Sequence, residues 1–380
     1  MKINIIGSIL GTSGYDSHTK GLANALYKIN PDIKLDVPLT NNWTQLVNDA
    51  ELAMIKTKPR TPDATIAVMT PPNWRIGLGD DTKKFIGYCV WEGSHIPKYW
   101  IEYLLDERVE QIWVPSEHTK KAIWNTYWDM DGDCQLEYGE EIEGEQDNIF
   151  WDKVKIVPHG IDPEIFKSDN SVRGPKDTFK FIVNKGWRGG MEDRGGVQYV
   201  LQAYSNEFKK DENVELMLKL NPAYINPEQV HAKIDELKLP KDAAPIKLAC
   251  TNITTDQLAK MFNRSDCYVC ATRAESFDLG TAEAMACGLP VITTGYGGQI
   301  EHMDENCAAF IDYELAEVKG DVMYEGINQA VPNVQHLQKI MRASFSQGLF
   351  TREKGRKAKE FIKDFTWDNT AKIAIDFLKE

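Results

Sequence analysis

Short apolar runs alternate along this chain with segments in which apolar residues recur every three or four positions. The first pattern is typical of buried strands, and the second is typical of helices that cover a sheet. The runs predict strands over residues 2–6, 64–69, 84–90, 111–114, 154–162 (ending in a turn), 179–184, 215–220, 246–249, 267–271 and 291–294. The spaced positions predict helices over residues 17–29, 229–237, 255–263, 282–286 and 365–378. This alternation favours an α/β fold with doubly wound parallel sheets.

The predicted elements fall into two halves joined by a polar connection. Residues 167–176 combine Ser, Asn, Gly, Pro and charged residues, which is typical of a linker. At 380 residues the chain is long enough for two domains of ordinary size. We therefore predict an N-terminal domain over residues 1–170 and a C-terminal domain over residues 171–362, followed by an amphipathic helix within residues 363–380.

The composition is that of a globular protein, with 42% hydrophobic and 27% charged residues. The sequence has no run of 18 apolar residues, so we expect no transmembrane segment. The apolar start at residues 2–6 is too short for a signal peptide, and the seven cysteines are scattered. Both features favour a reducing, cytoplasmic location. The net charge of −13 argues against nucleic acid as a partner, because binding to a phosphate backbone needs a basic surface.

Much of the negative charge lies in one segment, residues 129–147, which holds nine acids and no Lys or Arg. Oxygen-bearing side chains within residues 129–140 occupy positions 1, 3, 5, 7, 9 and 12 of a calcium-loop pattern. Cys134 replaces the Gly that such loops need at position 6. We therefore favour a solvated insertion over a Ca²⁺ site. Cys267 and Cys270 lie in a predicted buried strand, so we expect them to pack in the core and not to bind zinc.

Two carboxylates stand eight residues apart across a predicted strand-to-helix loop. Glu275 follows the strand over residues 267–271, and Glu283 falls in the first turn of the helix over residues 282–286. In open α/β sheets ligands bind at the carboxyl ends of the strands, and a helix N-terminus suits a phosphate. A carboxylate beside that phosphate can only accept hydrogen bonds, so sugar or ribose hydroxyls are its natural partners. The alternative is a surface acid with a second acid that favours the helix dipole.

The residues around these carboxylates resemble a known signature. Residues 275–291 carry Glu, seven residues and a second Glu, followed by Ala-Met-Ala-x-Gly-x-Pro-Val. This stretch resembles the retaining glycosyltransferases of family 4. The resemblance implies a GT-B architecture, in which two Rossmann-like domains face each other across a cleft. It implies that residues 1–170 bind the acceptor, that residues 171–362 bind the nucleotide sugar, and that the helix within residues 363–380 crosses back to the N-terminal domain. It also implies that Glu275 contacts the transferred sugar and that Glu283 contacts the ribose of the nucleotide.

The same resemblance implies that Phe277, Asp278 and Leu279 lie beside the donor. This chain departs from the usual pattern here, because the family commonly has Gly in place of Ser276 and Asp278 and Pro in place of Gly280. An Asp278 carboxylate near a diphosphate would be repulsive unless its side chain points away.

A Gly-rich loop over residues 185–196 supplies candidate cations. Arg188 and Arg194 lie in it, and guanidinium groups bind phosphate in a forked, charge-assisted geometry. Lys185 is a further candidate. Family 4 has Arg and Lys at this spacing, and the resemblance implies that Arg188 and Arg194 contact the donor pyrophosphate in the same way. The alternative is an exposed turn whose Arg residues pair with Glu192 and Asp193.

The N-terminal half offers fewer candidates. The turn after the first strand is also Gly-rich, and the resemblance places Gly14 beside the donor. Glu92 and His95 follow the strand over residues 84–90, so they are the polar candidates on the acceptor side of the reacting sugar. His95 can take up a proton near neutral pH. A loop His and a helix-capping Glu are the alternative.

These features predict an enzyme that transfers a sugar from a nucleoside-diphosphate sugar to a hydroxyl group of a glycan, lipid or small molecule. The cations would stabilise the leaving diphosphate. The resemblance implies that Glu275 orients the sugar, and that the donor phosphate takes the acceptor proton on the face from which it departs. We expect no cofactor and no metal, because the cations are Arg. A nucleotide-sugar epimerase or phosphorylase of the same architecture, and an inactive carbohydrate-binding homologue, stay open as alternatives.

Overall fold

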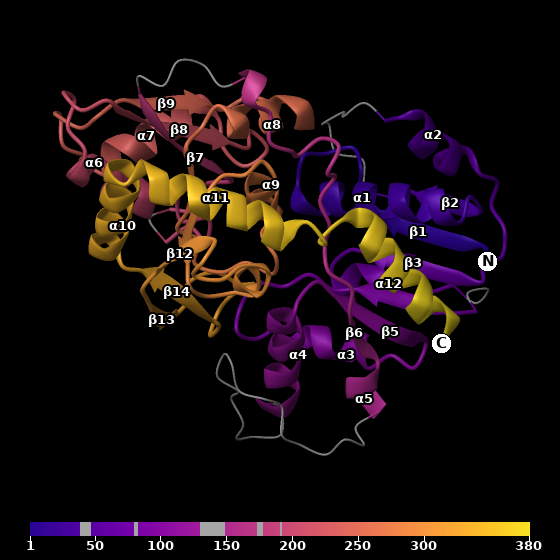
Figure 1. The fold of residues 1–380 in the computed structure, drawn as a ribbon. Coiled ribbons are helices and arrows are strands. Elements are labelled where there is room, and N and C mark those ends of the chain that lie inside the picture. Colours follow the sequence, from indigo (N-terminus) through magenta and orange to yellow (C-terminus); the bar gives the residue numbers. More distant parts are fainter. Residues whose placement is uncertain (39–46, 80–82, 130–148, 173–177, 191) are drawn as a thin grey trace. The chain divides into compact units, whose positions relative to one another are not determined.

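The structure is a computed structural model that describes residues 1–38, 47–79, 83–129, 149–172, 178–190 and 192–380 (Figure 1). The chain divides into two compact units. Unit 1 comprises Met1–Gly160, Glu317–Asn328 and Phe365–Glu380, and unit 2 comprises Ile161–Ala316 and Gln329–Asp364. The sequence places the domain boundary at residues 170/171, whereas the structure divides the chain at Gly160/Ile161. The sequence also does not predict that the segment Glu317–Asn328 belongs to unit 1.

Unit 1 is built on a parallel sheet of six strands in the order β2-β1-β3-β4-β5-β6. The strands are β1 (Ile3–Gly7), β2 (Ile33–Asp36), β3 (Ala64–Val68), β4 (Phe85–Tyr88), β5 (Val109–Val114) and β6 (Val154–Ile156). The accompanying helices are α1 (Gly14–Ile29), α2 (Asp49–Lys56), α3 (Ile101–Leu104), α4 (Glu117–Asp129), α5 (Ile149–Asp152) and α12 (Trp367–Lys379). Every residue of β3 is buried, as expected for a central strand of a parallel sheet that helices cover on both faces.

Helix α12 returns the end of the chain to unit 1, where it packs against α1. The contact is close, because a Cβ atom on Gly21 would lie 2.1 Å from the Trp367 ring and one on Gly160 would lie 2.2 Å from the Trp367 nitrogen. The buried ring of His18 stacks on Trp367 at a centroid distance of 5.8 Å. Glycine at positions 21 and 160 therefore makes room for this helix.

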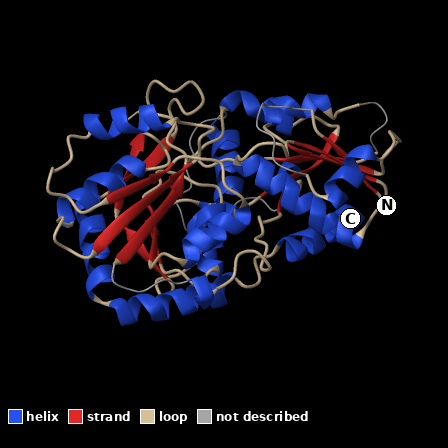
Figure 2. Cartoon of the chain, turned by 90° about the horizontal axis from the view of Figure 1, so that it is seen from above, coloured by secondary structure: helices blue, strands red, loops and turns tan. Residues whose placement is uncertain are grey.

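Unit 2 repeats the plan with a second sheet that helices flank (Figure 2). This sheet is parallel, and its strands lie in the order β12-β11-β10-β7-β8-β9. The strands are β7 (Phe179–Lys185), β8 (Val214–Leu220), β9 (Ile246–Ala249), β10 (Cys267–Cys270), β11 (Val291–Thr294) and β12 (Ala308–Ile311). The helices are α6 (Val197–Glu207), α7 (Pro227–Glu236), α8 (Thr255–Asn263), α9 (Leu279–Ala286), α10 (Val334–Ser346) and α11 (Gly348–Ile362). A separate two-stranded sheet pairs β13 (Tyr313–Glu317) with β14 (Asn328–Pro332).

The order of the strands reverses in unit 2 between β7 and β10. The chain builds β7, β8 and β9 in one direction across the sheet and then β10, β11 and β12 in the other. Such a switch point separates the loops that follow the two central strands, and ligands bind there in open α/β sheets. The loops after β7 and β10 are therefore where unit 2 can bind a ligand.

The predicted α/β fold class, with two doubly wound parallel sheets, is confirmed. The prediction for α9 was wrong by three residues, because the helix begins at Leu279 and not at Ala282. Asp278 serves as its N-cap and its side chain accepts a hydrogen bond from the Thr281 amide. Glu283 consequently lies in the second helical turn and not in the first.

Two further expectations concern the whole chain. None of the helices in the described parts combines the length and apolar character needed to cross a bilayer. Six of the seven cysteines fall in those parts, and all six are buried and form no disulfide, including Cys267 and Cys270 of β10. The packing prediction for this pair is therefore confirmed.

Candidate functional site

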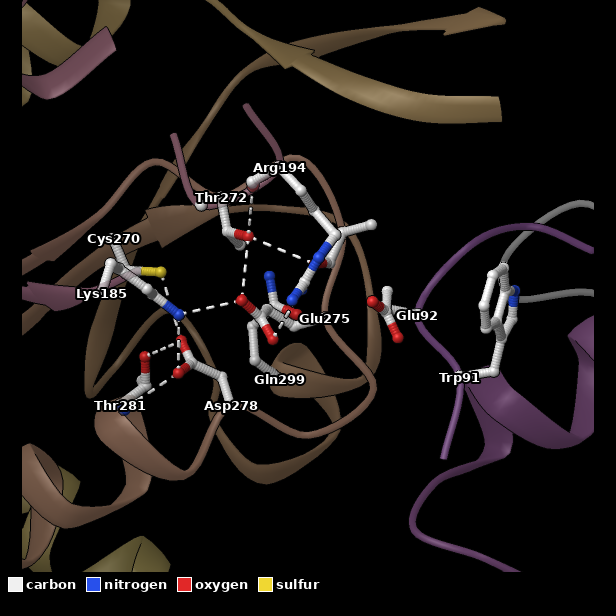
Figure 3. Close-up of polar contacts among 12 residues, drawn as sticks. Trp91, Glu92, Lys185, Arg194, Cys270, Thr272, Glu275, Asp278, Thr281 and Gln299 are labelled. Atoms are coloured by element: carbon white, nitrogen blue, oxygen red, sulfur yellow. Dashed lines mark hydrogen bonds and ion pairs between the residues drawn. The ribbon is translucent and has the colours of Figure 1, made fainter. Parts of the chain in front are cut away.

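Charged side chains gather at the switch point of unit 2 (Figure 3). Lys185 is the last residue of β7, and Glu275 and Asp278 lie in the loop between β10 and α9. The Lys185 Nζ atom lies 3.0 Å from Glu275 Oε1 and 2.8 Å from Asp278 Oδ1. One ammonium group therefore joins two carboxylates that come from the other side of the switch point.

Both carboxylate oxygens of Glu275 are held. Oε1 accepts a hydrogen bond from the Thr272 hydroxyl at 3.1 Å as well as the contact from Lys185, and Oε2 lies 3.2 Å from Arg194 Nη1. The same Arg194 nitrogen donates to the Ala274 carbonyl at 2.7 Å. These contacts fix the orientation of Glu275 at the carboxyl end of β10, where the sequence placed it.

Asp278 is buried, and its charge is balanced within the protein. Its oxygens accept hydrogen bonds from the Thr281 hydroxyl and amide and from the Cys270 thiol, whose Sγ lies 3.2 Å away. Burial by itself would raise the pKa of Asp278, but the Lys185 ammonium, together with the hydrogen bonds from Lys185, Thr281 and Cys270, outweighs burial and lowers the pKa below its usual value. The repulsion expected between Asp278 and a diphosphate is thereby offset by Lys185.

Glu283 lies one turn further along α9 and is partly exposed. Burial and, to a lesser degree, the negative charge of Asp278 raise the pKa of Glu283 to about 8. Near neutral pH the unliganded protein therefore holds a proton on Glu283. Sequence reasoning could not reveal this shift in pKa, because the shift depends on how α9 is buried.

Two neighbours of Asp278 were also predicted to lie beside the donor. The Phe277 ring is buried and packs on the His302 ring at a centroid distance of 4.5 Å, so this side chain belongs to the core of unit 2. Leu279 is the first residue of α9 and is partly exposed.

The Gly-rich loop after β7 is held by a lysine from α7. Lys233 Nζ donates hydrogen bonds to the carbonyls of Trp187 at 3.0 Å, of Arg188 at 3.3 Å and of Gly189. The Arg188 side chain is exposed to solvent. Sequence reasoning missed Lys233, because nothing in its own surroundings indicates that it reaches this loop.

The acids of the same loop have partners other than Arg188 and Arg194. Glu192 pairs with the buried Arg273, whose Nη1 lies 2.6 Å from Glu192 Oε2. Asp193 accepts hydrogen bonds from two loop amides, those of Gly189 at 2.6 Å and Gly195 at 2.9 Å. Glu192 and Asp193 are therefore held by Arg273 and by the backbone of the loop.

The first Gly-rich turn, in unit 1, binds a carboxylate of its own. Asp16 accepts hydrogen bonds from the amides of Gly11 at 2.7 Å and Ser13 at 3.1 Å, and from the hydroxyls of Ser8 and Ser13. Gly14 begins α1, and a Cβ atom built on it would meet nothing within 4 Å. The space beside Gly14 is therefore open, whereas the amides of Gly11 and Ser13 already have an anionic partner.

Glu92 lies in the loop after β4 in unit 1 and contacts a residue that sequence reasoning missed. Its Oε1 accepts a hydrogen bond from the hydroxyl of Tyr324, which belongs to the segment Glu317–Asn328. The Tyr324 ring stacks on the buried Trp91 ring at a centroid distance of 4.9 Å. No sequence signal links residues so far apart in the chain.

His95, in the same loop, is flanked by two polar groups. Its Nδ1 lies 3.0 Å from Ser94 Oγ and its Nε2 lies 3.0 Å from Asp129 Oδ2. Burial lowers the pKa of His95 below its usual value, although Asp129 opposes this shift. His95 is therefore neutral at pH 7, which suits a proton acceptor.

The calcium-loop pattern, which we interpreted as a solvated insertion, falls almost entirely on residues that the structure does not describe. Asp129 ends α4, but residues 130–140 of the calcium-loop pattern lie outside the described residues. In the parts that the structure does describe, no group of three or more His, Cys, Asp or Glu side chains is placed to hold a metal ion.

Comparison with known proteins points to one family. Residues 186–317 match the family model described as glycosyl transferases group 1. A probable sucrose-phosphate synthase of Thermosipho melanesiensis is 28% identical over 234 residues, which cover 60% of this chain and 48% of that protein. D-inositol 3-phosphate glycosyltransferase of Paenarthrobacter aurescens is 20% identical over 237 residues, which cover 60% of this chain and 52% of that protein. The chain thus spans about half the length of the curated relatives it matches.

Solved structures share the fold over the whole chain. Anabaena HepE in complex with UDP-glucose superposes with a TM-score of 0.69 at 14% identity and covers 100% of both chains. Sucrose-phosphate synthase from Thermosynechococcus elongatus gives a TM-score of 0.68 at 12% identity and covers 99% of this chain and 98% of that one. At such identities the likeness shows the fold alone. The solved structures therefore show a GT-B fold for the whole chain, and residues 186–317 are similar to the group 1 glycosyltransferases.

Proposed function

We propose that this protein transfers a sugar, with retention of its anomeric configuration, from a nucleoside-diphosphate sugar to a hydroxyl group of a carbohydrate or lipid-linked acceptor. The observation that carries the proposal is the arrangement of Glu275 at the switch point of unit 2. Lys185, Thr272 and Arg194 all fix its carboxylate. The N-terminus of α9 follows in the same loop, with Glu283 one turn beyond it.

In this proposal the donor lies across the loops after β7 and β10. Glu275 accepts a hydrogen bond from a hydroxyl of the transferred sugar, and Glu283 accepts from the ribose. Arg194 and Arg188 balance the charge that grows on the diphosphate as the bond from the anomeric carbon to the phosphate oxygen breaks. That electron pair stays on the phosphate. The phosphate then takes the proton of the acceptor hydroxyl while the new bond forms on the same face.

The acceptor is assigned to unit 1, where Glu92 and His95 are the polar residues after β4. A neutral His95 and the Glu92 carboxylate both accept hydrogen bonds, and an acceptor hydroxyl needs such partners to be oriented. Tyr324 shares the Glu92 carboxylate and so limits the directions from which a ligand can approach it.

A ligand screen tests the proposal. We expect one class of UDP-, GDP-, ADP- or TDP-sugar to raise the melting temperature, and we expect the chain to hydrolyse that donor slowly in the absence of an acceptor. UDP-glucose is the first to test, because HepE is solved in complex with it. Binding without any hydrolysis or transfer would favour the inactive homologue, and no stabilisation by any of the four classes would contradict the proposal.

Nucleotide affinity should depend on pH through Glu283. If the bound form is the carboxylate, the proton that the free protein holds below about pH 8 must leave on binding, so affinity for UDP-glucose should rise from pH 6 to pH 8.5. UDP-glucose is suited to this measurement because its diphosphate has no protonation step in this range. Titration calorimetry on the wild type and Glu283→Gln checks the result, and the variant should show no such rise. An equal rise of UDP-glucose affinity with pH in both proteins would contradict the proposal that Glu283 contacts the ribose.

Turnover should persist in excess EDTA. The cations assigned to the diphosphate are Arg188 and Arg194, and the carboxylate of Asp278 already serves Lys185, Thr281 and Cys270. The measurement is release of UDP from UDP-glucose with and without EDTA. A variant lacking residues 130–147 separates any loss of Ca²⁺ from that segment and spares Asp129, which contacts His95. If EDTA abolishes turnover in this variant while it stays folded, and Mg²⁺ or Mn²⁺ restores it, the prediction of metal-independent transfer is wrong.

A further inference from the structure

We propose that Lys185 is a positioning residue: it holds Glu275 and Asp278 in a fixed relation and is not a ligand of the diphosphate. The inference rests on the proposed function, in which Glu275 meets the transferred sugar. It assigns to Lys185 a role on the sugar half of the donor, whereas its place in a Gly-rich loop with Arg188 and Arg194 had made it a candidate phosphate cation.

The geometry of the switch point supports this role. Lys185 comes from the end of β7, and both of its carboxylate partners follow β10, the neighbouring strand. Its side chain is 9% exposed, compared with 15% for Glu275 and 4% for Asp278. Charges this deeply buried are costly unless they are paired, and here each carboxylate has the same ammonium group as a partner.

The backbone at Asp278 adds an independent observation. Its φ angle of 62° lies in the left-handed region, which glycine adopts readily and other residues seldom do. Asp occupies this position while its side chain caps α9 and pairs with Lys185. Lys185 therefore pairs with the residue that caps α9 as well as with Glu275.

Charge explains what the loss of Lys185 would do. Burial by itself would lower the pKa of Lys185, but its neighbours, with Asp278 first and Glu275 among them, together outweigh burial and raise the pKa well above its usual value. The side chain is therefore charged at neutral pH. Without this cation the two neighbouring carboxylates would repel each other, and among the ion pairs of the described residues Glu275 would keep its contact with Arg194. The loop between β10 and α9 would then shift, or one carboxylate would take up a proton.

A double-mutant cycle on the full-length chain tests the inference. The variants are Lys185→Met, Asp278→Gly and the double variant, because Gly suits the φ angle at position 278 and removes the unpaired carboxylate. Lys185→Arg keeps the charge. Lys180→Met is the matched control, because Lys180 lies on the same strand and its side chain is 39% exposed. Each protein is measured for melting temperature, for affinity toward UDP and UDP-glucose, and for UDP release.

We expect Lys185→Met to lower turnover and the affinity for UDP-glucose at least about tenfold, the scale of one charge-assisted hydrogen bond, and to leave UDP affinity within about threefold. Both losses, and the drop in melting temperature, should be smaller when Asp278→Gly is also present. Lys185→Arg should retain more activity than Lys185→Met.

Four outcomes would contradict a positioning role for Lys185. Equal weakening of UDP and UDP-glucose would make Lys185 a diphosphate ligand. Identical losses with and without Asp278→Gly, or a double variant that melts as low as Lys185→Met, would show that the two residues are not coupled. If Lys185→Met leaves melting temperature, affinity and UDP release unchanged, Lys185 has no role in the site. Failure of the proposed function looks different, because the wild type itself would then neither bind nor turn over a nucleoside-diphosphate sugar.

Discussion

Replacing Glu275 with Gln should lower the turnover of UDP-glucose by about 10²–10³-fold, the usual cost of removing one group that stabilises developing charge. Affinity for UDP alone should stay within about threefold, because UDP lacks the sugar that Glu275 is proposed to contact. The physical reason is that the carboxylate is fixed by Lys185, Thr272 and Arg194 and can meet the sugar without rearranging. Steady-state release of UDP and calorimetry with UDP check the two halves of this prediction.

Two comparisons make the Glu275 result specific. Glu314→Gln changes an exposed acid on β13 and should leave both quantities unchanged. Glu283→Ala should show the opposite pattern, with UDP and UDP-glucose weakened together, because the ribose is common to both ligands. If Glu275→Gln weakens UDP and Glu283→Ala spares it, the roles of the two glutamates must be exchanged.

Arg194→Ala should weaken UDP binding by about 1.5–3 kcal/mol, the range for a hydrogen bond to a charged group, and Arg188→Ala should do the same. Arg194 is anchored by Glu275 and the Ala274 carbonyl, so it meets the diphosphate already oriented. Arg188 is exposed and must be ordered on binding, which places its expected effect toward the lower end of this range.

Calorimetry with UDP measures both arginine effects, and Arg264→Ala, an exposed arginine after α8, is the control. Arg194→Ala also removes a partner of Glu275, so turnover should fall further than affinity in that variant. Unchanged UDP affinity in both Arg188→Ala and Arg194→Ala would contradict the proposal that these two arginines bind the diphosphate.

The sequence predicted the elements of the sheets better than the contacts between them. β9, α8 and β11 begin and end where the apolar pattern placed them, because each is a short run bounded by polar or turn residues. The pairing of Lys185 with Glu275 and Asp278 was not predictable in this way. It depends on β7 lying beside β10, and periodicity does not specify the order of strands.

The start of α9 and the role of Asp16 differ in how far the sequence could predict them. The start of α9 was misplaced because Asp278 caps the helix from a left-handed conformation, which departs from the extended N-cap that the sequence rules describe. By contrast, the role of Asp16 carried a signal in the sequence. Ser13 and Asp16 stand three residues apart at the start of α1, and this spacing is that of a capping box.

The return of α12 to unit 1 has a consequence for the order in which the protein can be made. Unit 1 draws on three separate stretches of chain, the last of which begins at Phe365. Until that stretch leaves the ribosome, the surface of α1 around Gly21 and the ring of His18 lack the cover of Trp367. The half that is synthesised first is therefore completed last, and a fragment that stops at Gly160 would expose to water an apolar surface that the full chain buries.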